Sequence, residues 1–399
     1  MFHVATGRSA HSDAYEAGRQ AADRAQAQVA RHAGRRPRPD LALVFGAAHY
    51  AQQRLIDGVA GVLGPDVVLV GCSSRGQITV QGVECESVVV MLIWPGSRLA
   101  VRPVLATDVG ANPYAAGLAL GRQVRAQLPY ATDVTTRTKL HGEHFVTIRP
   151  YTLLLFSDST GSDHALLAGA AQALGPAFQI AGGVASSTFR MEEACVYFNG
   201  TVHHDAAVGL AIGSRVPTAI GVCHGCHADH HAMRTAPADG NAIQQLGGWP
   251  AVELRAEFQN GHQYASPAAL AVGLGDRNGY DSLHPPARLL MAGEAAQRLA
   301  VQWTECAAQC VFDAARAAAA SARSGLGTAE PAAAMLFASA THLDRFGSSA
   351  VSHKLAAIRA VLGETVPIIG FYSHGEFGTP GNSSPDLYNQ TCVLYVIGR

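Results

Sequence analysis

The sequence predicts an α/β fold in which β-α-β units recur and form mixed sheets layered with helices. Apolar strands alternate with helical segments, and a strand-helix-strand order occurs three times. In each copy one glycine ends the helix and another, seven positions later, ends the next strand: 64 and 71, 175 and 182, 363 and 370. We expect a two-domain αββα-like sandwich, and a ring of three units is the alternative.

Composition narrows the class of protein. Hydrophobic residues make up 48% and charged residues 15% of the 399 residues, which is typical of a globular protein with a large core. The formal net charge of -1 gives no indication of a nucleic-acid partner or an anionic membrane surface. No apolar run has the length of a membrane span or the form of a signal peptide. We therefore expect a cytoplasmic protein with reduced cysteines and no nucleic-acid or membrane partner.

The N-terminal part is predicted to be a helix over residues 12–31, where alanines are interspersed with polar residues and Ser12 or Asp13 can cap the first turn. A basic, proline-broken segment at 35–39 follows and indicates a solvated linker. The expected parts are 1–39 as N-terminal helix and linker, 40–215 as the first domain and 216–399 as the second.

The three copies align on their strands. Their first strands are predicted at 41–46, 152–156 and 334–337, and their last strands at 67–70, 178–181 and 366–369. Phe45 and Phe156 each lie 19 positions before the helix-ending glycine, whereas Phe337 lies 26 positions before it. This difference predicts an insertion at 342–347 in the third copy.

Polar side chains follow the last strand of the third copy, where glycines let the backbone approach another surface. Only this copy carries Tyr372, His374 and Glu376 there, with Asn389 shortly after. Two roles for Glu376 stay open: it binds a ligand, for example the ammonium of an amino acid, or it orders the loop by accepting hydrogen bonds from neighbouring amides. We expect a ligand site that contains Cys72, Ser73, Ser74, Arg75, Tyr372, His374, Glu376 and Asn389.

A cluster of cysteines and histidines occupies residues 223–231. Thiolates and imidazoles are ligands for zinc, copper and iron, so Cys223, Cys226, His227 and His230 are candidate metal ligands. The segment also matches the C-x-x-C-H attachment sequence of c-type haem, and haem held non-covalently by His227 or His230 is a further alternative. In the structural alternative Cys223 is a core residue and the histidines decorate an exposed turn.

Two enzyme classes are not predicted. The serines that follow the strands at 67–70 and 366–369 miss the G-x-S-x-G spacing of a nucleophile elbow. No glycine-rich phosphate loop opens a helix.

Three segments resemble the FIST domain family. They are GCSSRGQI at 71–78, CHGC at 223–226 leading to AIQQLGGWPA at 242–251, and GFYSHGEFG at 370–378 with NQT at 389–391. The resemblance covers roughly residues 40–399, and it implies a sensory or ligand-binding module for small molecules such as amino acids. Some bacterial members of the family are haem proteins that sense nitric oxide and regulate histidine kinases.

We therefore expect a sensory protein that binds a small ligand, with haem among the candidates. It would signal through a separate partner such as a histidine kinase, and it could form a homo-oligomer. The competing prediction is a metal-dependent hydrolase or redox enzyme that uses the cluster at 223–231.

Overall fold

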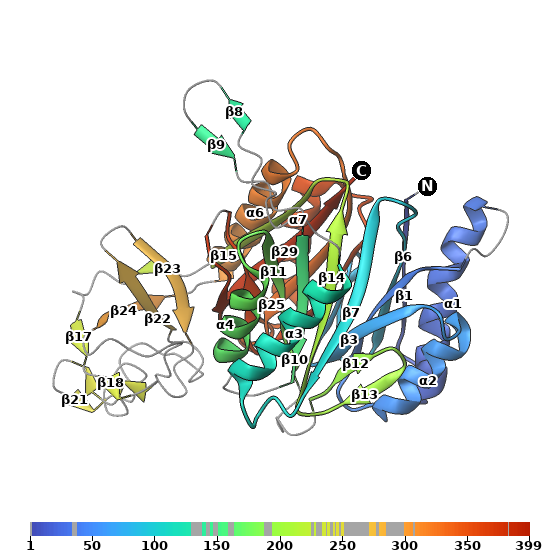
Figure 1. Cartoon of the computed structure of the whole chain (residues 1–399), viewed down its shortest axis with the longest axis horizontal. Coiled ribbons are helices and arrows are strands. Elements are labelled where there is room, and N and C mark those ends of the chain that lie inside the picture. The colour runs from blue at the N-terminus through green and yellow to red at the C-terminus, as the bar shows by residue number, and fades with distance from the viewer. Residues whose placement is uncertain are drawn as a thin grey trace.

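A computed structural model gives the fold of the chain. It describes residues 2–33, 38–128, 138–140, 144–146, 151–158, 163–186, 194–224, 227–228, 234–236, 238–239, 242–243, 245–246, 249–250, 271–276, 279–284, 299–305, 308–381 and 383–399. Three mixed sheets of six strands each meet in the centre, and paired helices cover their outer faces (Figure 1). None of the described helices is long and apolar enough to cross a membrane.

Each large sheet belongs to one of three units with the same order of elements. Unit 1 contains β1 (His3–Ser9), α1 (Ala14–Ala33), β2 (Leu41–Ala47), α2 (Gln52–Leu63), β3 (Val68–Ser74), β4 (Gln77–Thr79), β5 (Gly82–Glu84) and β6 (Val88–Trp94). Unit 2 contains β7 (Leu99–Thr107), α3 (Pro113–Gln127), β10 (Tyr151–Ser157), α4 (Asp163–Leu174), β11 (Phe178–Val184), β12 (Val196–Phe198), β13 (Thr201–His203) and β14 (Ala206–Ser214). Unit 3 contains β15 (Thr218–His224), α6 (Ala308–Gly325), β25 (Pro331–Ser339), α7 (Ala340–Leu362), β26 (Ile368–Ser373), β27 (Glu376–Gly378), β28 (Asp386–Tyr388) and β29 (Thr391–Gly398).

Shorter strands lie within units 2 and 3. Unit 2 includes the hairpin of β8 (Thr138–Leu140) and β9 (His144–Val146). Unit 3 includes β16 (His227–Ala228), β17 (Arg234–Ala236), β18 (Ala238–Asp239), β19 (Ala242–Ile243), β20 (Gln245–Leu246), β21 (Trp249–Pro250), β22 (Ala271–Asp276), β23 (Gly279–His284) and β24 (Leu299–Glu305). These strands pair among themselves and not with the three large sheets.

The predicted fold class is confirmed, since β-α-β units recur and form mixed sheets layered with helices. In each unit the two main strands are parallel, as in the pairs β2 with β3, β10 with β11 and β25 with β26. The described residues form three such units, which is the number expected for the alternative architecture, a ring of three units. The predicted domain boundaries stay a prediction, and the one between 215 and 216 falls in the turn from unit 2 to unit 3.

Each sheet is completed by a hairpin from another unit. The strand orders are β1-β6-β2-β3-β12-β13, β7-β14-β10-β11-β27-β28 and β15-β29-β25-β26-β4-β5. Unit 2 thus donates a hairpin to unit 1, unit 3 donates one to unit 2, and unit 1 donates one to unit 3. The exchange closes a ring, and it pairs the edges that β3, β11 and β26 would otherwise leave open.

The inner faces of the three sheets share one hydrophobic core. Phe45, Phe156 and Phe337, the residues on which the copies align, meet there with Phe371, and all four are fully buried. Ring centroids are 5.6 Å apart for Phe45 and Phe156, and 5.9 Å for Phe156 and Phe337. Edge-to-face contacts of this kind stabilise a core beyond the burial of area, so the repeated phenylalanine joins the units.

The outer faces bear helices in pairs (Figure 1). α1 and α2 cover the first sheet, α3 and α4 the second, and α6 and α7 the third. The predicted cap of α1 is present, because the Asp13 carboxylate accepts a hydrogen bond from the Glu16 amide at 3.0 Å. The predicted insertion forms the start of α7, which has a kink at Gly347 with φ of 71°.

The strands predicted to end at Gly71, Gly182 and Gly370 continue past these glycines, because β3, β11 and β26 end at Ser74, Val184 and Ser373. The three glycines lie within the strands and have a shared physical cause. At Gly182, φ is +148° and a Cβ atom would lie 1.9 Å from the Leu155 carbonyl oxygen on the neighbouring strand. The equivalent distances at Gly71 and Gly370 are 1.8 and 1.9 Å. A side chain at these positions would therefore force the parallel strands apart.

We predict that Gly182→Ala destabilises the protein by about 3 kcal/mol or more, because it adds a collision with backbone to an unfavourable φ. Gly175→Ala is the matched control, since Gly175 has φ of +74° but open space around its Cβ position. That change should cost only about 1 to 2 kcal/mol. Denaturant unfolding of both variants checks this, and equal losses would contradict the role given to strand contact.

Candidate functional site

The loops that follow β3, β11 and β26 interlock at one end of the ring. The Arg75 amide donates to Ser186 Oγ at 2.9 Å, and Ser186 Oγ donates to the Tyr372 carbonyl at 2.5 Å. The His374 amide donates to the Val184 carbonyl at 3.2 Å. Arg75, Ser186 and His374 each lie four positions after the strand glycine of their unit. The chain therefore brings equivalent positions of all three units together.

Two predicted ligand residues, Arg75 and His374, come from different units and are both half-buried. Burial lowers the pKa of His374, and the positive charge of Arg75 lowers it further. His374 is therefore neutral at pH 7. The structure thus places these two predicted residues at the same end of the ring.

The other predicted residues of unit 1 serve the fold. Cys72 is fully buried in the central core, and burial raises the pKa of its thiol well above the usual value. Ser73 Oγ accepts a hydrogen bond from the Cys195 amide at 3.0 Å. Ser74 Oγ accepts one from the Gln77 side-chain amide at 2.8 Å. The first bond joins unit 1 to unit 2, and the second orders the turn between β3 and β4 within unit 1.

Glu376 is fully buried at the start of β27. Its Oε1 accepts a hydrogen bond from Ser373 Oγ at 2.6 Å, and its Oε2 accepts one from the Thr391 amide at 3.2 Å. Burial raises the pKa of Glu376 to about 8, and the two hydrogen bonds and the charge of Lys354 only partly oppose this. Glu376 therefore orders the turn, which is one of its two predicted roles, and its protonated form is favoured at pH 7.

Asn389 and Tyr372 flank this turn on different sides. Asn389 Nδ2 donates to the His374 carbonyl at 3.2 Å, and Asn389 Oδ1 accepts from Ser339 Oγ at 3.4 Å. Tyr372 is fully buried under the helices, with Lys354 Nζ 5.5 Å from its ring centroid. The described surroundings of Tyr372 and Glu376 thus differ, and a shared ligand site of Tyr372, His374 and Glu376 stays a prediction.

A cavity of about 380 Å³ lies where β15, β28 and β29 come together, next to the Glu376 turn. We call it the C-terminal cavity. Its lining residues are Val222, Cys223, His224, Pro380, Ser383, Asp386, Tyr388 and Thr391. Cys223 belongs to one segment singled out by sequence, and Asn389 of the other lies between two lining residues. The fold therefore brings the start of the cluster at 223–231 next to the segment that contains Asn389, although the sequence alone indicates two separate candidate sites.

The described lining of the C-terminal cavity combines polar and apolar groups and contains no Lys or Arg. Asp386 is half-exposed, accepts a hydrogen bond from the Leu387 amide at 2.8 Å and lies 3.9 Å from His164 Nε2. Burial raises the pKa of the Cys223 thiol, so this thiol is protonated at pH 7. The cavity thus offers a carboxylate, an imidazole at His224, hydroxyls and a neutral thiol.

No sequence motif marks Ser383, Asp386 or Tyr388 as a site residue, and His224 is marked only as part of the cluster at 223–231. Asp386 and Tyr388 line the cavity because β28 pairs with β27. That pairing carries this segment against β15, a relation for which the sequence holds no local signal. Nearness to Asn389 is the one feature that could have pointed to them.

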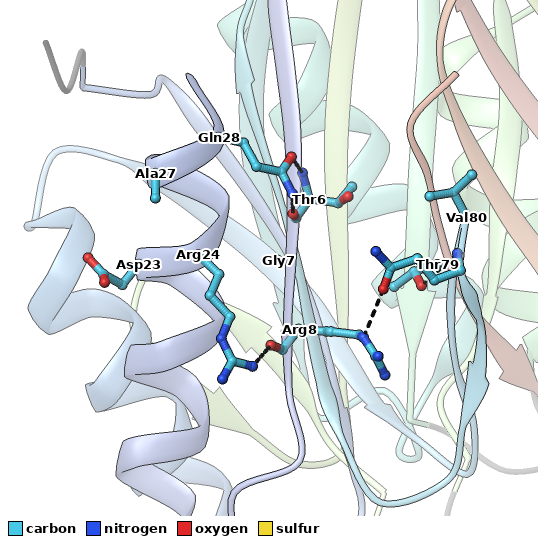
Figure 2. A pocket seen from close by; sticks show the side chains of 10 residues that line it. Thr6, Gly7, Arg8, Asp23, Arg24, Ala27, Gln28, Thr79 and Val80 are labelled. Atoms are coloured by element: carbon cyan, nitrogen blue, oxygen red, sulfur yellow. Dashed lines mark hydrogen bonds between the residues drawn. The ribbon is translucent and has the colours of Figure 1, made fainter. Parts of the chain in front are cut away.

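A second cavity, of about 320 Å³, lies beside β1 between α1 and the β4–β5 turn (Figure 2). The Gln28 side chain accepts from the Thr6 amide at 3.3 Å and donates to the Thr6 carbonyl at 2.6 Å. Arg24 donates to the Arg8 carbonyl at 2.6 Å, and the Arg8 side chain pairs with Glu84. Because β1 is an edge strand, these side chains satisfy its free backbone groups. This cavity therefore has a structural explanation.

The predicted metal ligands are only partly within the described residues. Cys223 is described, His227 lies in β16 without a described side chain, and Cys226 and His230 lie outside the described residues. Within the described part of the chain, no three Cys, His, Asp or Glu side chains converge to hold a metal ion. The described residues thus do not assemble a haem or metal site, and both stay predictions.

Two solved structures show distant similarity to the chain. A cyanuric acid hydrolase from A. caulinodans is 13% identical with a TM-score of 0.39, and the alignment covers 100% of this chain and 99% of that one. T. maritima PurL complexed with ATP is 10% identical with a TM-score of 0.23, over 82% of this chain and 73% of that one. No curated protein matches the chain.

Comparison with protein-family models gives a clear result. The FIST N domain matches residues 40–248, and the FIST C domain matches residues 259–379. The first match alone spans more than half of the 399 residues. The chain therefore belongs to the FIST family.

Proposed function

We propose that this FIST protein is a sensor that binds a small amine-bearing ligand, such as an amino acid, in the C-terminal cavity. FIST domains are sensory and ligand-binding domains. One observation carries the proposal: Cys223 and His224 line the same cavity as Asp386, Tyr388 and Thr391, from a segment about 160 positions further along the chain. The signal would pass to a separate protein, and a histidine kinase is the partner class that the family suggests.

The chemistry of the lining supports an amine. A volume of about 380 Å³ is in the range of small-molecule sites. The Asp386 carboxylate can accept charge-assisted hydrogen bonds from an ammonium group. Ser383, Tyr388 and His224 can hydrogen-bond the remaining polar atoms, while Val222 and Pro380 supply apolar contact. An anionic ligand would meet no described cationic Lys or Arg in the lining.

We predict that at least one of the twenty L-amino acids raises the melting temperature of the protein and binds measurably by titration calorimetry. Asp386→Asn should weaken that binding about tenfold or more, because a charge-assisted hydrogen bond contributes about 1.5 to 3 kcal/mol. Asp57→Asn is the control, since Asp57 is exposed on α2 in another unit. The proposal fails if no amino acid or simple amine binds, or if both variants bind like the native protein.

The location of the ligand can be tested through Cys223. We predict that a bound amino acid slows alkylation of Cys223 by iodoacetamide severalfold, because the thiol lines the cavity. Peptide mapping by mass spectrometry measures the rate, and the exposed Cys85 serves as internal control. Equal protection of both thiols, or of neither, would place the ligand elsewhere.

A further inference from the structure

The core of unit 3 contains a buried lysine where the other units have leucine. Lys354 lies nine positions before Gly363, just as Leu55 and Leu166 lie nine positions before the helix-ending glycines of their units. All three side chains are at most 1% exposed. Burying an ammonium group is costly unless other groups compensate for it, so this replacement demands an explanation that packing does not give.

A second replacement in unit 3 matches the first. Glu376 lies six positions after Gly370, where unit 1 has Gln77 six positions after Gly71. Gln77 contacts Ser74 and accepts a hydrogen bond from the Ser87 amide, as Glu376 contacts Ser373 and accepts from the Thr391 amide. Equivalent serines thus hold an amide in unit 1 and a carboxylate in unit 3, with Ser74 accepting from Gln77 and Ser373 donating to Glu376. The lysine and the carboxylate occur in the same unit.

The surroundings of this pair also belong to unit 3 almost entirely. Lys354 Nζ lies 3.3 Å from Nδ1 of His342, a residue of the insertion at the start of α7. Among the described residues, the titratable groups that face Glu376 and Lys354 are His342 on α7, Tyr372 on β26 and Cys392 on β29, with Cys223 beside Cys392 and Cys85 beside Tyr372. Lys354 attracts the ionised form of Glu376, and burial opposes it.

Glu376 is hydrogen-bonded to a residue that lines the C-terminal cavity. The Thr391 amide donates to its Oε2, and Thr391 lines the cavity. Tyr388, another lining residue, is the register partner of Glu376 in the β27–β28 pair. Thr391 therefore separates a charge at Glu376 from a ligand in the C-terminal cavity.

We propose that Lys354 and Glu376 are positioning residues of the C-terminal cavity, and that ligand binding there is coupled to the loss of a proton from Glu376. The inference rests on the proposed function. An amine in the cavity favours the ionised carboxylate behind Thr391, and the proton leaves to solvent. Lys354 stabilises this ionised state, because burying a carboxylate without a nearby cation would cost far more free energy.

The effect on stability has a definite sign. Because the folded-state pKa of Glu376, about 8, is above the unfolded value of 4.5, the folded protein retains a proton that the unfolded chain releases. The contribution is fully favourable below pH 4.5 and is lost as pH rises through 8. Glu376→Gln should remove this part of the pH dependence, with the amide bonding as Gln77 does in unit 1.

A double-mutant cycle tests the charge couple without any ligand. Lys354→Leu should lower the melting temperature most above pH 8, where it leaves a carboxylate without its cation. Lys354→Leu combined with Glu376→Gln recreates the unit 1 pair and should restore at least the native melting temperature. Gln77→Glu is the mirrored control, since unit 1 has Leu55 at the position of Lys354 and the change should destabilise unit 1 above pH 8. Parallel pH profiles for all variants would overturn the proposed couple.

Coupling to the ligand is tested by calorimetry of the best-binding amino acid at pH 7, in phosphate and in Tris buffer. The native protein should release close to one proton on binding, and the double variant none. Equal release from both would overturn the coupling while leaving the proposed function intact. If the native protein binds no amino acid, both the proposed function and its coupling to proton release are overturned. The charge interaction between Lys354 and Glu376 is then tested by the pH profiles alone.

Discussion

The exchange of hairpins between units is the constraint on which the rest of the structure depends. A strand of three residues such as β4, β12 or β27 cannot be stable alone, and β3, β11 and β26 would each expose an edge without it. Each unit therefore completes its sheet with a segment of another unit. The same exchange draws the strand ends together at one end of the ring, which is where Arg75, Ser186 and His374 meet.

A repeated framework lets function arise from the differences between copies. The glycines, the central phenylalanines and the turn hydrogen bonds are shared, and they account for most of the motif residues. The C-terminal cavity lies in unit 3, and the same unit has a buried lysine, a buried carboxylate and an insertion that supplies His342. These departures lie side by side in space, although they are spread along the chain.

The repeated units could be predicted from sequence because glycine spacing has a local physical cause. The insertion at 342–347 and the cap at Asp13 could be predicted as well. β1 could not, because residues 3–9 include polar and small side chains that hide the strand pattern. The hairpin exchange and the lining residue Asp386 depend on pairings between distant segments. The burial of Lys354 was visible only through its register with Leu55 and Leu166.

Native-state hydrogen exchange tests the ring most directly. If the hairpins hold the units together, the amides of Ile78, Tyr197 and Phe377, each opposite a strand glycine, open only with the global unfolding of the protein. Their opening free energies should then equal those of Phe45, Phe156 and Phe337 in the central strands. Exchange of the hairpin amides through a separate opening of lower free energy, with the central strands still protected, would contradict this account.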